Sequence, residues 1–153
     1  MLFKNHAQLY ETIRDYGVFE ENKTVIGCVA VGIIWADLAE VRALAVAPGH
    51  QGKGVGRSLV EWCVGEARRM GIRKLMSLTY EETFFAKLQF VVVAKETLPL
   101  KVWTDCVKCP KNQNCDEIAM VRELTDVPRI DAEKALPTPR GIRIPVLPYV
   151  SPE

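Results

Sequence analysis

The residues best suited to chemistry lie in one glycine-rich segment, QGKGVGRS at residues 51–58. Glycines let the backbone come close to a ligand, and a helix N-terminus offers unpaired N–H groups with a partial positive charge. Lys53 and Arg57 add formal charge to the segment. It follows a strand-like run that ends at Val46 and precedes a helical pattern that starts near Gly54. The segment therefore predicts an anion site, and a pyrophosphate is its natural occupant.

Two well-known phosphate-binding patterns do not fit this segment. The Walker pattern needs Gly-Lys-Ser/Thr after a glycine and four further residues, and counting from Gly49 its lysine is missing. The dinucleotide fingerprint needs a third glycine, which is missing whether the count starts at Gly52 or at Gly54. What remains is Gln-x-x-Gly-x-Gly after a strand that ends LAVAP. The alternative is a tight strand-to-helix turn that binds nothing.

The hydrophobic pattern around the segment predicts an alternation of strands and helices. The run at 24–35 is almost wholly apolar and rich in Val and Ile, as in a strand buried on both faces. The run at 39–46 alternates, which places Val41, Ala43 and Ala45 on one side and Glu40, Arg42, Leu44 and Val46 on the other. We expect helices over 6–14, 54–70 and 82–88, and strands over 16–21, 24–35, 39–46, 74–79 and 90–94. This order predicts a mixed α/β (α+β) fold with helices packed on one sheet.

Length and composition narrow the class of protein. A chain of 153 residues fits one domain, which we place at 1–122, followed by a tail at 123–153 that holds six of the nine prolines. The net charge of +1 gives no electrostatic reason to expect nucleic acid. No apolar run is long enough for a transmembrane helix, and no secretory signal is visible, so we expect no membrane partner. Five cysteines without an export signal favour a reducing, cytoplasmic location.

The stretch LAVAPGHQGKGVGRSLV resembles the acetyl-CoA loop of the GCN5-related N-acetyltransferase (GNAT) family, whose pattern is Gln/Arg-x-x-Gly-x-Gly/Ala. The resemblance covers about residues 16–121 and implies a mixed, mostly antiparallel sheet flanked by helices. It implies that acetyl-CoA is held by the main chain of the preceding strand and by the loop. The residues so assigned are Leu44, Ala45, Val46, Gln51, Gly52, Lys53, Gly54, Val55, Gly56, Arg57 and Ser58.

Further stretches (WADLAEVRALAV, LTYEETFFAKLQF and LPLKVWTDCVKCP…NCDEIAM) look like short amino-acid N-acetyltransferases related to N-acetylglutamate synthase. This implies transfer to the α-amino group of an amino acid, glutamate first, by direct attack in a ternary complex, and a place in arginine biosynthesis. The chain departs from the family pattern in three ways. Phe85 stands where a tyrosine acid is usual, Gln89 stands where glycine is usual, and we expect the first strand and helix of the family pattern to be missing at the start.

The resemblance suggests roles for polar residues outside the loop. Glu40 is the candidate base that takes a proton from the acceptor amine, or else a charge paired with Arg42. Tyr80 is the candidate acid in place of the missing tyrosine, or else a half-buried packing residue. For a dicarboxylic acceptor we expect Arg42 and Lys101 as cationic partners and Trp103 as an apolar wall.

Two features leave alternatives open. Cys106, Cys109 and Cys115 have spacing that suits a structural zinc, an unligated thiol cluster or a redox disulfide. A sheet without its first strand exposes an edge that could pair with a second copy, which predicts a homodimer. The rival functions are a GNAT enzyme for another small amine and a non-catalytic acyl-CoA- or metal-binding interaction protein.

Overall fold

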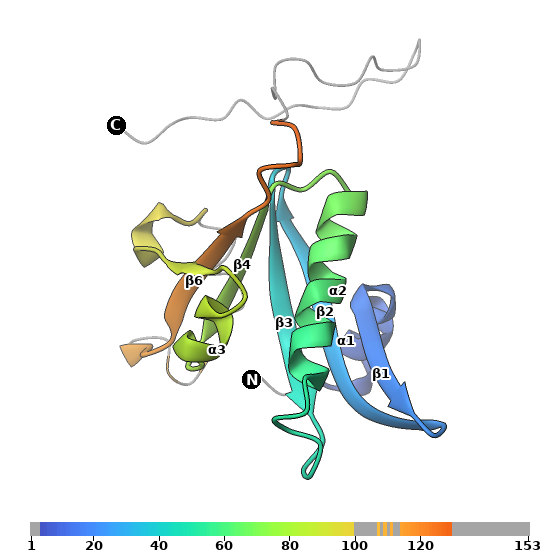
Figure 1. Ribbon diagram of the computed structural model, residues 1–153. Helices are drawn as coiled ribbons and strands as arrows, with labels where there is room; N and C mark the ends of the chain where they lie inside the picture. The colour runs from blue at the N-terminus through green and yellow to red at the C-terminus, as the bar shows by residue number, and fades with distance from the viewer. Residues whose placement is uncertain (1–3, 100–106, 108, 110, 112–113, 130–153) are drawn as a thin grey trace.

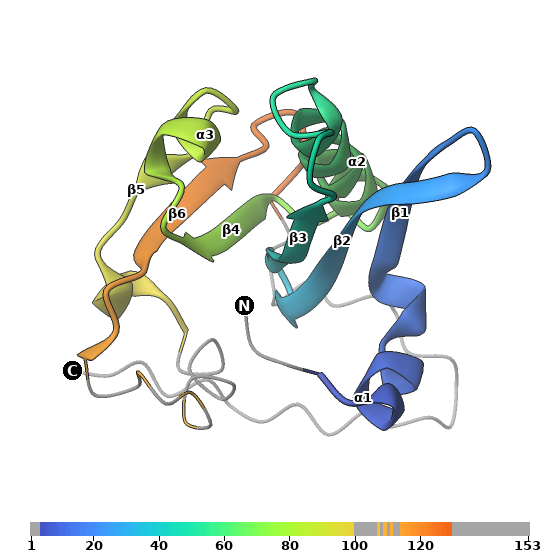
Figure 2. The same ribbon diagram turned by 90° about the horizontal axis from the view of Figure 1, so that it is seen from below.

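A computed structural model describes residues 4–99, 107, 109, 111 and 114–129. Six strands form one sheet in the order β1-β2-β3-β4-β6-β5, and every neighbouring pair is antiparallel except β3 and β4, which are parallel. Helices α2 and α3 lie on one side of this sheet and α1 on the other (Figures 1 and 2). The mixed, mostly antiparallel fold predicted from the sequence is confirmed.

The first two strands form a hairpin whose turn explains its register. Strands β1 (Tyr16–Glu21) and β2 (Thr24–Trp35) are joined by Asn22 and Lys23, which have φ of 49° and 63°. Two consecutive residues with positive φ define the two-residue turn that matches the twist of paired strands. Strand β2 is buried from Ile26 to Gly32 apart from half-buried Cys28, as its nearly unbroken apolar run predicts.

Helix α2 (Val55–Arg69) covers the sheet and supplies most of one core cluster. Its buried face consists of residues at helical spacing: Val55, Leu59, Val60, Cys63, Val64 and Ala67. Burial raises the pKa of the Cys63 thiol to about 12, so this thiol stays protonated and serves as a small apolar core residue. The helix ends at Arg69, and Gly71, with a φ of 70°, together with the bond from Ile72 N to Ala67 O (2.8 Å) forms a left-handed cap behind it.

The other half of the sheet joins β4 (Lys74–Thr79) to β6 (Ile118–Glu123) and β5 (Val91–Val92). Helix α3 (Glu82–Ala86) packs on the same face as α2 through Phe85, which is 3% exposed. A second cluster on the opposite face joins Ile34, Leu38 and Met76 with Leu98 and Ala119.

Several boundaries differ from the prediction. The hydrophobic pattern did not predict a strand at β6. Strand β5 is two residues long, because only Val91 and Val92 are paired with β6 as strand residues. The first helix, α1 (His6–Glu11), is followed by a 3-10 turn at Ile13–Asp15 and has no buried residue. Packing also continues beyond residue 122, since Leu124 and Val127 are 2% and 5% exposed in the core.

Two observations concern the surface. Among the described residues, β1 pairs only with β2 and forms one edge of the sheet, so the exposed edge lies at Tyr16–Glu21. Pairing of a second copy along this edge stays a prediction. Within the described part of the chain, no helix combines the length and apolar character needed to cross a membrane.

Candidate active site

The site begins where the two parallel strands separate. Strand β3 (Leu38–Val46) pairs with β4 only from Leu38 to Glu40, opposite Lys74 to Met76. Beyond this point β3 continues along β2 and β4 continues along β6, and no further β3–β4 pair occurs among the described residues. Figure 1 shows the two strands diverging toward the end at which α2 begins. The backbone of β3 from Val41 to Val46 therefore presents an edge to this opening that no described strand occupies.

A bulge in β3 shapes that edge. Ala43 has a φ of 51°, and the register with β2 shifts between Cys28/Ala45 and Ala30/Arg42, so β3 holds one extra residue. The Cys28 thiol donates to the carbonyl oxygen of Ala43 at a sulfur–oxygen distance of 3.7 Å.

The bulge overturns the simple alternation predicted for 39–46. Leu44 and Val46 pack against the same core cluster as Val41, on the α2 side, whereas the sequence pattern placed them with Glu40 and Arg42. The extra residue reverses the side-chain parity after Ala43. Leu44, Ala45 and Val46 are each half-buried, and the main chain is what they offer to a ligand in the opening.

The glycine loop lies at the end of β3 and leads into α2. Gly49, Gly52 and Gly54 have φ of 81°, 74° and 88°, and a Cβ built on any of them would meet nothing within 4 Å. These glycines are thus required by backbone conformation, and the space beside them is open. Gly54 is the N-cap of α2 and makes no side-chain capping bond, so the first N–H groups of this helix have no side-chain cap.

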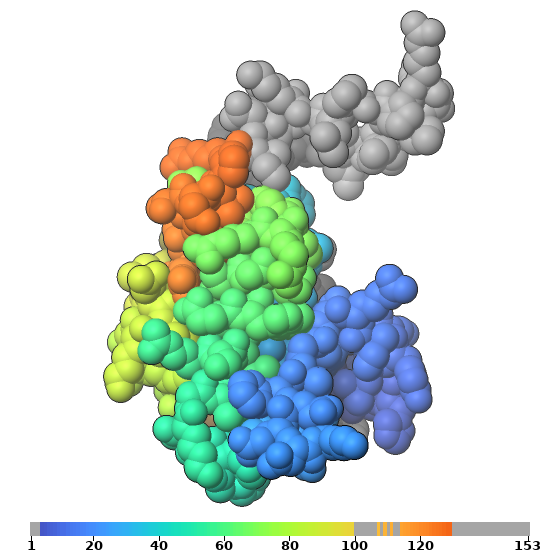
Figure 3. Space-filling view, turned by 45° about the vertical axis from the view of Figure 1, so that its right-hand side comes forward, coloured from blue at the N-terminus to red at the C-terminus, as the bar shows by residue number. Residues whose placement is uncertain are grey.

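The predicted loop residues divide by exposure. Gln51, Lys53, Arg57 and Ser58 are exposed, whereas Val55 is 6% exposed and anchors the helix in the core. Any contact of Val55 with a ligand would therefore use its main chain. In space-filling view the loop forms the lower end of the molecule beside the β1–β2 hairpin (Figure 3), and His50 Nε2 lies 3.7 Å from Glu21 Oε2 at the hairpin tip.

Helix α3 closes the other side of the opening. A Cβ built on Gly56 would meet the Phe84 ring at 3.4 Å and Val46 at 3.7 Å, so Phe84 contacts the first turn of α2. The ring of Phe85, where the family pattern has tyrosine, packs in the core against Phe84 and Phe90 with ring centroids 5.1 Å apart. The contact of Phe84 with α2 could not be predicted from the sequence, because two adjacent phenylalanines do not show which one faces the core.

Glu40 and Arg42 form an ion pair on the face of the sheet opposite α2. The Nε of Arg42 donates to Oε2 of Glu40 at 2.7 Å, and the two side chains are 26% and 15% exposed. The pair begins where β3 and β4 part, since Glu40 is the last residue of β3 that is paired with β4. The structure therefore brings together the predicted base and the predicted carboxylate partner.

Tyr80 follows β4 and belongs to a polar cluster at the rim. Its hydroxyl donates to Asp116 Oδ1 at 2.7 Å, and Lys111 Nζ lies 3.3 Å from the same hydroxyl and 5.2 Å from the ring centroid. The bond to Asp116 is the main reason why the pKa of Tyr80 is raised, and it also lowers the pKa of Asp116. Tyr80 therefore remains a protonated phenol near neutral pH. Neither Lys111 nor Asp116 could be linked to Tyr80 from the sequence, because they lie 31 and 36 residues away along the chain.

The remaining predicted residues are Lys101 and Trp103, expected to bind the acceptor, and the cysteines Cys106, Cys109 and Cys115. Lys101, Trp103 and Cys106 lie outside the described residues. Cys109 and Cys115 are half-buried and make no disulfide with a described cysteine. Within the described part of the chain, no group of three or more His, Cys, Asp or Glu residues could hold a metal ion. The three-cysteine zinc site stays a prediction.

Comparison with known proteins agrees with this arrangement. The sequence pattern of the Acetyltransferase (GNAT) family matches residues 4–90, more than half of the chain. The chain belongs to this family. An uncharacterized N-acetyltransferase of Chlorobaculum tepidum is 40% identical over 124 residues, which are 81% of this chain and 80% of that protein. The present protein is thus an N-acetyltransferase with the GNAT fold.

Relatives named amino-acid acetyltransferase share a lower sequence identity with this chain. The amino-acid acetyltransferase of Mycobacterium tuberculosis is 32% identical over 108 residues, which are 69% of this chain and 62% of that protein. N-acetylglutamate synthase from Neisseria gonorrhoeae, crystallised with coenzyme A and N-acetyl-glutamate, aligns with a TM-score of 0.72 and 27% identity. That alignment covers 81% of this N-acetyltransferase and 29% of the synthase chain. A M. tuberculosis protein crystallised with CoA aligns with a TM-score of 0.70 and 26% identity, over 81% of this chain and 84% of that one.

Proposed function

We propose that this N-acetyltransferase moves the acetyl group of acetyl-CoA to the α-amino group of an amino acid, with glutamate as the first acceptor to test. The observation that carries the proposal is the opening between β3 and β4 beside the glycine loop and the α2 N-terminus, which has no side-chain cap. Relatives named amino-acid acetyltransferase and the gonococcal synthase bound to coenzyme A and N-acetyl-glutamate support this choice of cofactor and acceptor.

The residues present fit a molecule with a pyrophosphate and a long extended arm. The N–H groups of the loop from Gly52 to Arg57 would hold the pyrophosphate, because left-handed Gly52 and Gly54 leave open space there and Lys53 and Arg57 supply positive charge. The main chain of β3 from Leu44 to Val46 would pair with the arm as an added strand would. Acetyl-CoA, when bound, supplies a thioester whose carbonyl carbon an amine can attack.

Glu40 and Arg42 would then handle the acceptor. Arginine binds carboxylates through its planar fork of N–H donors, so Arg42 would hold a carboxylate of the amino acid. The ion pair with Arg42 orients the Glu40 carboxylate, which would take a proton from the ammonium group directly or through a water molecule. Loss of that proton exposes the nitrogen lone pair, which forms the new C–N bond as the C–S bond breaks. The nitrogen then loses its second proton through water, which restores the phenol of Tyr80 after that group has protonated the sulfur, and Glu40 releases its proton to solvent.

Tyr80 would supply the proton that the departing sulfur needs. It follows the end of β4, across the opening from β3, and its raised pKa keeps the hydroxyl protonated. Asp116 accepts a hydrogen bond from the hydroxyl at 2.7 Å and thereby fixes the direction of the ring. In this proposal the phenol hydroxyl turns from Asp116 to the sulfur as negative charge develops there.

A turnover assay tests this function. Purified protein would be incubated with acetyl-CoA and each of the twenty amino acids in turn, and released CoA would be separated by chromatography so that the protein's own five cysteines do not interfere. We expect the highest kcat/KM with glutamate and a mass increase of one acetyl group on the amino acid. Turnover only with other amines would overturn the choice of acceptor. Tight acetyl-CoA binding without turnover of any amine would overturn the enzyme in favour of an acyl-CoA-binding protein.

Three wider expectations stay predictions. A role in arginine biosynthesis depends on glutamate as the acceptor, whereas a cytoplasmic location is expected from five cysteines without an export signal. A homodimer formed along the β1 edge also stays a prediction, supported by the exposed Val18 and Val25, which are 59% and 55% exposed on β1 and β2. Light scattering at several protein concentrations would test the dimer.

A further inference from the structure

The guanidinium group of Arg42 occupies the place that a side chain would take on the neighbouring strand. Gly32 of β2 is directly paired with Glu40 of β3, and Arg42 lies two residues further along β3. A Cβ built on Gly32 would lie 2.8 Å from both Cζ and Nε of Arg42 and 3.1 Å from one Nη. Real carbon atoms do not approach this closely, so any other residue at position 32 requires Arg42 to move.

This close approach fixes the pair that the proposed reaction uses. The guanidinium lies against the backbone of Gly32 while its Nε donates to Glu40 at 2.7 Å, so both contacts constrain the plane and the direction of the group. Gly32 is buried and does not have a positive φ, so its value here is the missing side chain and not its backbone freedom. Nε is one of five N–H donors, and a guanidinium held in a fixed plane loses less entropy when it binds a carboxylate.

We propose that Gly32 is a positioning residue that selects the acceptor. By leaving room for the Arg42 guanidinium beside Glu40, it places one group that binds a carboxylate next to one that binds an ammonium. This inference rests on the proposed function. It says which feature of the acceptor is recognised, namely a carboxylate close to the reacting amine, as in α-amino acids. For amines without a carboxylate, the position that Gly32 gives to the Arg42 guanidinium would not improve binding.

The inference makes a demand that is specific to arginine. A lysine at position 42 ends in a compact ammonium on a flexible stem and does not need a flat surface to lie on. A methyl group at position 32 should therefore matter when residue 42 is arginine and should matter little when it is lysine. Residues that act through each other in this way show non-additive effects in a double-mutant cycle.

The kinetic test compares wild type, Gly32→Ala, Arg42→Lys and the double variant, with the amino acid that the wild type acetylates best. We expect Gly32→Ala to displace the Arg42 guanidinium and so raise the acceptor KM about 10- to 100-fold, as loss of a hydrogen bond between charged groups typically costs, with the KM for acetyl-CoA unchanged. In the Arg42→Lys background the same change should alter the acceptor KM less than about 2-fold. Equal effects of Gly32→Ala in both backgrounds would overturn the inference.

Gly17→Ala provides a matched control. A Cβ on Gly17 of β1 would meet the Trp62 ring at 2.8 Å, so this variant introduces a comparable clash on the α2 side of the sheet, away from Glu40 and Arg42. It should lower Tm and leave the acceptor KM unchanged. If Gly17→Ala raises the acceptor KM as much as Gly32→Ala does, the effect is general loosening of the sheet and the inference is wrong.

A readout without turnover keeps this inference separate from the proposed function. In ¹⁵N NMR spectra the side-chain Nε–H signal of Arg42, assigned through its loss in Arg42→Lys, should shift in Gly32→Ala and stay in place in Gly17→Ala. Unfolding gives a second check: Gly32→Ala should lower Tm less in the Arg42→Ala background than in the wild type, because the side chain that the new methyl group would meet is gone. An unshifted Nε signal or an equal loss of Tm in both backgrounds overturns the role of Gly32, even if amino acids are acetylated. A wild type that acetylates no amino acid overturns the proposed function, whatever the spectra show.

Discussion

The two ends of helix α2 use the same backbone conformation for different purposes. Gly54 precedes the helix with a φ of 88°, Gly71 follows it with a φ of 70°, and a Cβ on either would meet nothing within 4 Å. At the first end the N–H groups have no side-chain cap and exposed Lys53 and Arg57 lie close by in sequence. At the second end the backbone groups are bonded, with Gly71 N on Arg68 O at 3.1 Å and Ile72 N on Ala67 O at 2.8 Å.

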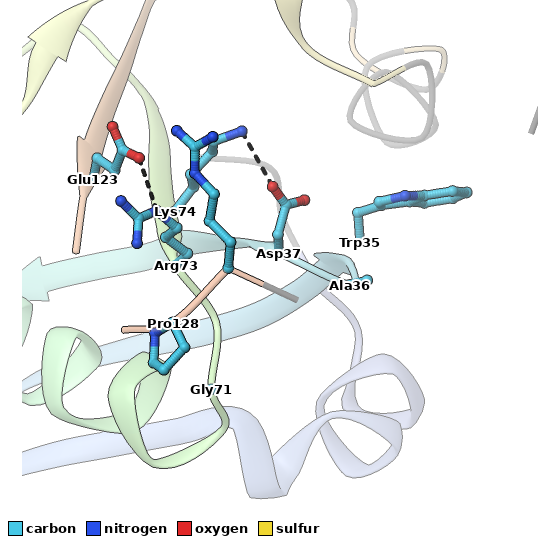
Figure 4. Close-up of a pocket in the computed structure, with 9 residues that line it drawn as sticks. Trp35, Ala36, Asp37, Gly71, Arg73, Lys74, Glu123 and Pro128 are labelled. Carbon is cyan, nitrogen blue, oxygen red and sulfur yellow. Dashed lines mark hydrogen bonds and ion pairs between the residues drawn. The ribbon is translucent and has the colours of Figure 1, made fainter. Parts of the chain in front are cut away.

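The charges at the second end are also committed to one another. A cavity of about 430 Å³ there is bordered by Trp35, Asp37, Arg73, Lys74 and Glu123, among others. Figure 4 shows Arg73 directed at Glu123 and Lys74 at Asp37, with distances of 2.8 and 3.1 Å. Arg73 also donates to the Val127 carbonyl. We expect the first end to be a ligand site, because Lys53 and Arg57 form no ion pair among the described residues, and the second end to be a chain reversal only, because the charges there are paired.

The largest expected effect is on the glycine that begins α2. Gly54→Glu puts a strained side chain and a negative charge into the predicted anion site, so it should abolish the rise in Tm that acetyl-CoA produces in the wild type. The matched control is Gly71→Ala, which should lower the free energy of unfolding by about 1 kcal/mol through the same left-handed strain and leave the acetyl-CoA shift intact. Thermal shift with and without acetyl-CoA measures both. An equal acetyl-CoA shift in Gly54→Glu and wild type would refute the loop assignment.

The next effect separates two carboxylates that each accept a bond from an arginine. Glu40→Gln should lower kcat/KM by roughly 10²- to 10⁴-fold at pH 7, with part of the loss recovered at high pH where the amine loses its proton unaided. Glu123→Gln removes the partner of Arg73 at the other end of the sheet and should leave kcat/KM unchanged. Steady-state kinetics from pH 6 to pH 10 would show the difference. Near wild-type activity of Glu40→Gln at pH 7 would make Glu40 a structural charge only.

Tyr80 is expected to give a smaller loss. Tyr80→Phe should lower kcat by about 10²-fold, at the low end of the range for general acids, and leave the KM for acetyl-CoA unchanged. Asp116→Asn keeps the hydroxyl and removes only its charged acceptor, so its effect on kcat should be smaller. Tyr10→Phe, on the exposed helix α1, is the control for loss of a hydroxyl. If Tyr80→Phe and Asp116→Asn lower Tm by similar amounts and leave kcat unchanged, the Tyr80–Asp116 bond stabilises the fold and takes no part in proton transfer.

The sequence predicts those parts of the fold in which a local pattern decides the structure. The hairpin 16–35, strand 74–79 and helix α2 follow their hydrophobic periods and turn residues. Strand β6 was missed, because it is held by pairing with β4 and β5, both distant in sequence. The bulge at Ala43 was missed for a related reason, since a non-glycine residue at a φ of 51° leaves no mark in the hydrophobic pattern.

The site shows the same division. The loop was found from its glycines, whose types report the backbone conformation directly. Gln89 is the opposite case, because it has a φ of 66° at the position where the family pattern has glycine, and its residue type does not reveal this. The contact of the Arg42 guanidinium with Gly32 and the Tyr80–Asp116 bond each join separate elements. Only the folded sheet brings these residues together.

The smallest expected effect is the response of the second end of α2 to acid. Bonds from Arg73 and Arg68 lower the pKa of Glu123 and of Asp126. Because the folded pKa lies below the unfolded one, each pair adds stability that is fully present above the ordinary carboxyl range and is lost as the pH falls through the folded pKa. We expect Tm to be level between pH 5 and 7 and to fall below about pH 4. The side chains of Glu123 and Asp126 are 45% and 57% exposed, so the change should be modest.

Variants and salt identify the groups responsible for this acid response. The double variant Glu123→Gln/Asp126→Asn should show a flatter fall in Tm below pH 4 than the wild type, since these two positions no longer take up protons. Salt at 1 M should also flatten the wild-type curve, because it screens exposed pairs. Parallel acid curves for the double variant and the wild type would show that these pairs contribute nothing measurable. The ordered end of α2 would then be held by its backbone bonds and apolar contacts alone, and the contrast with the glycine-loop end would rest on backbone bonding and not on charge.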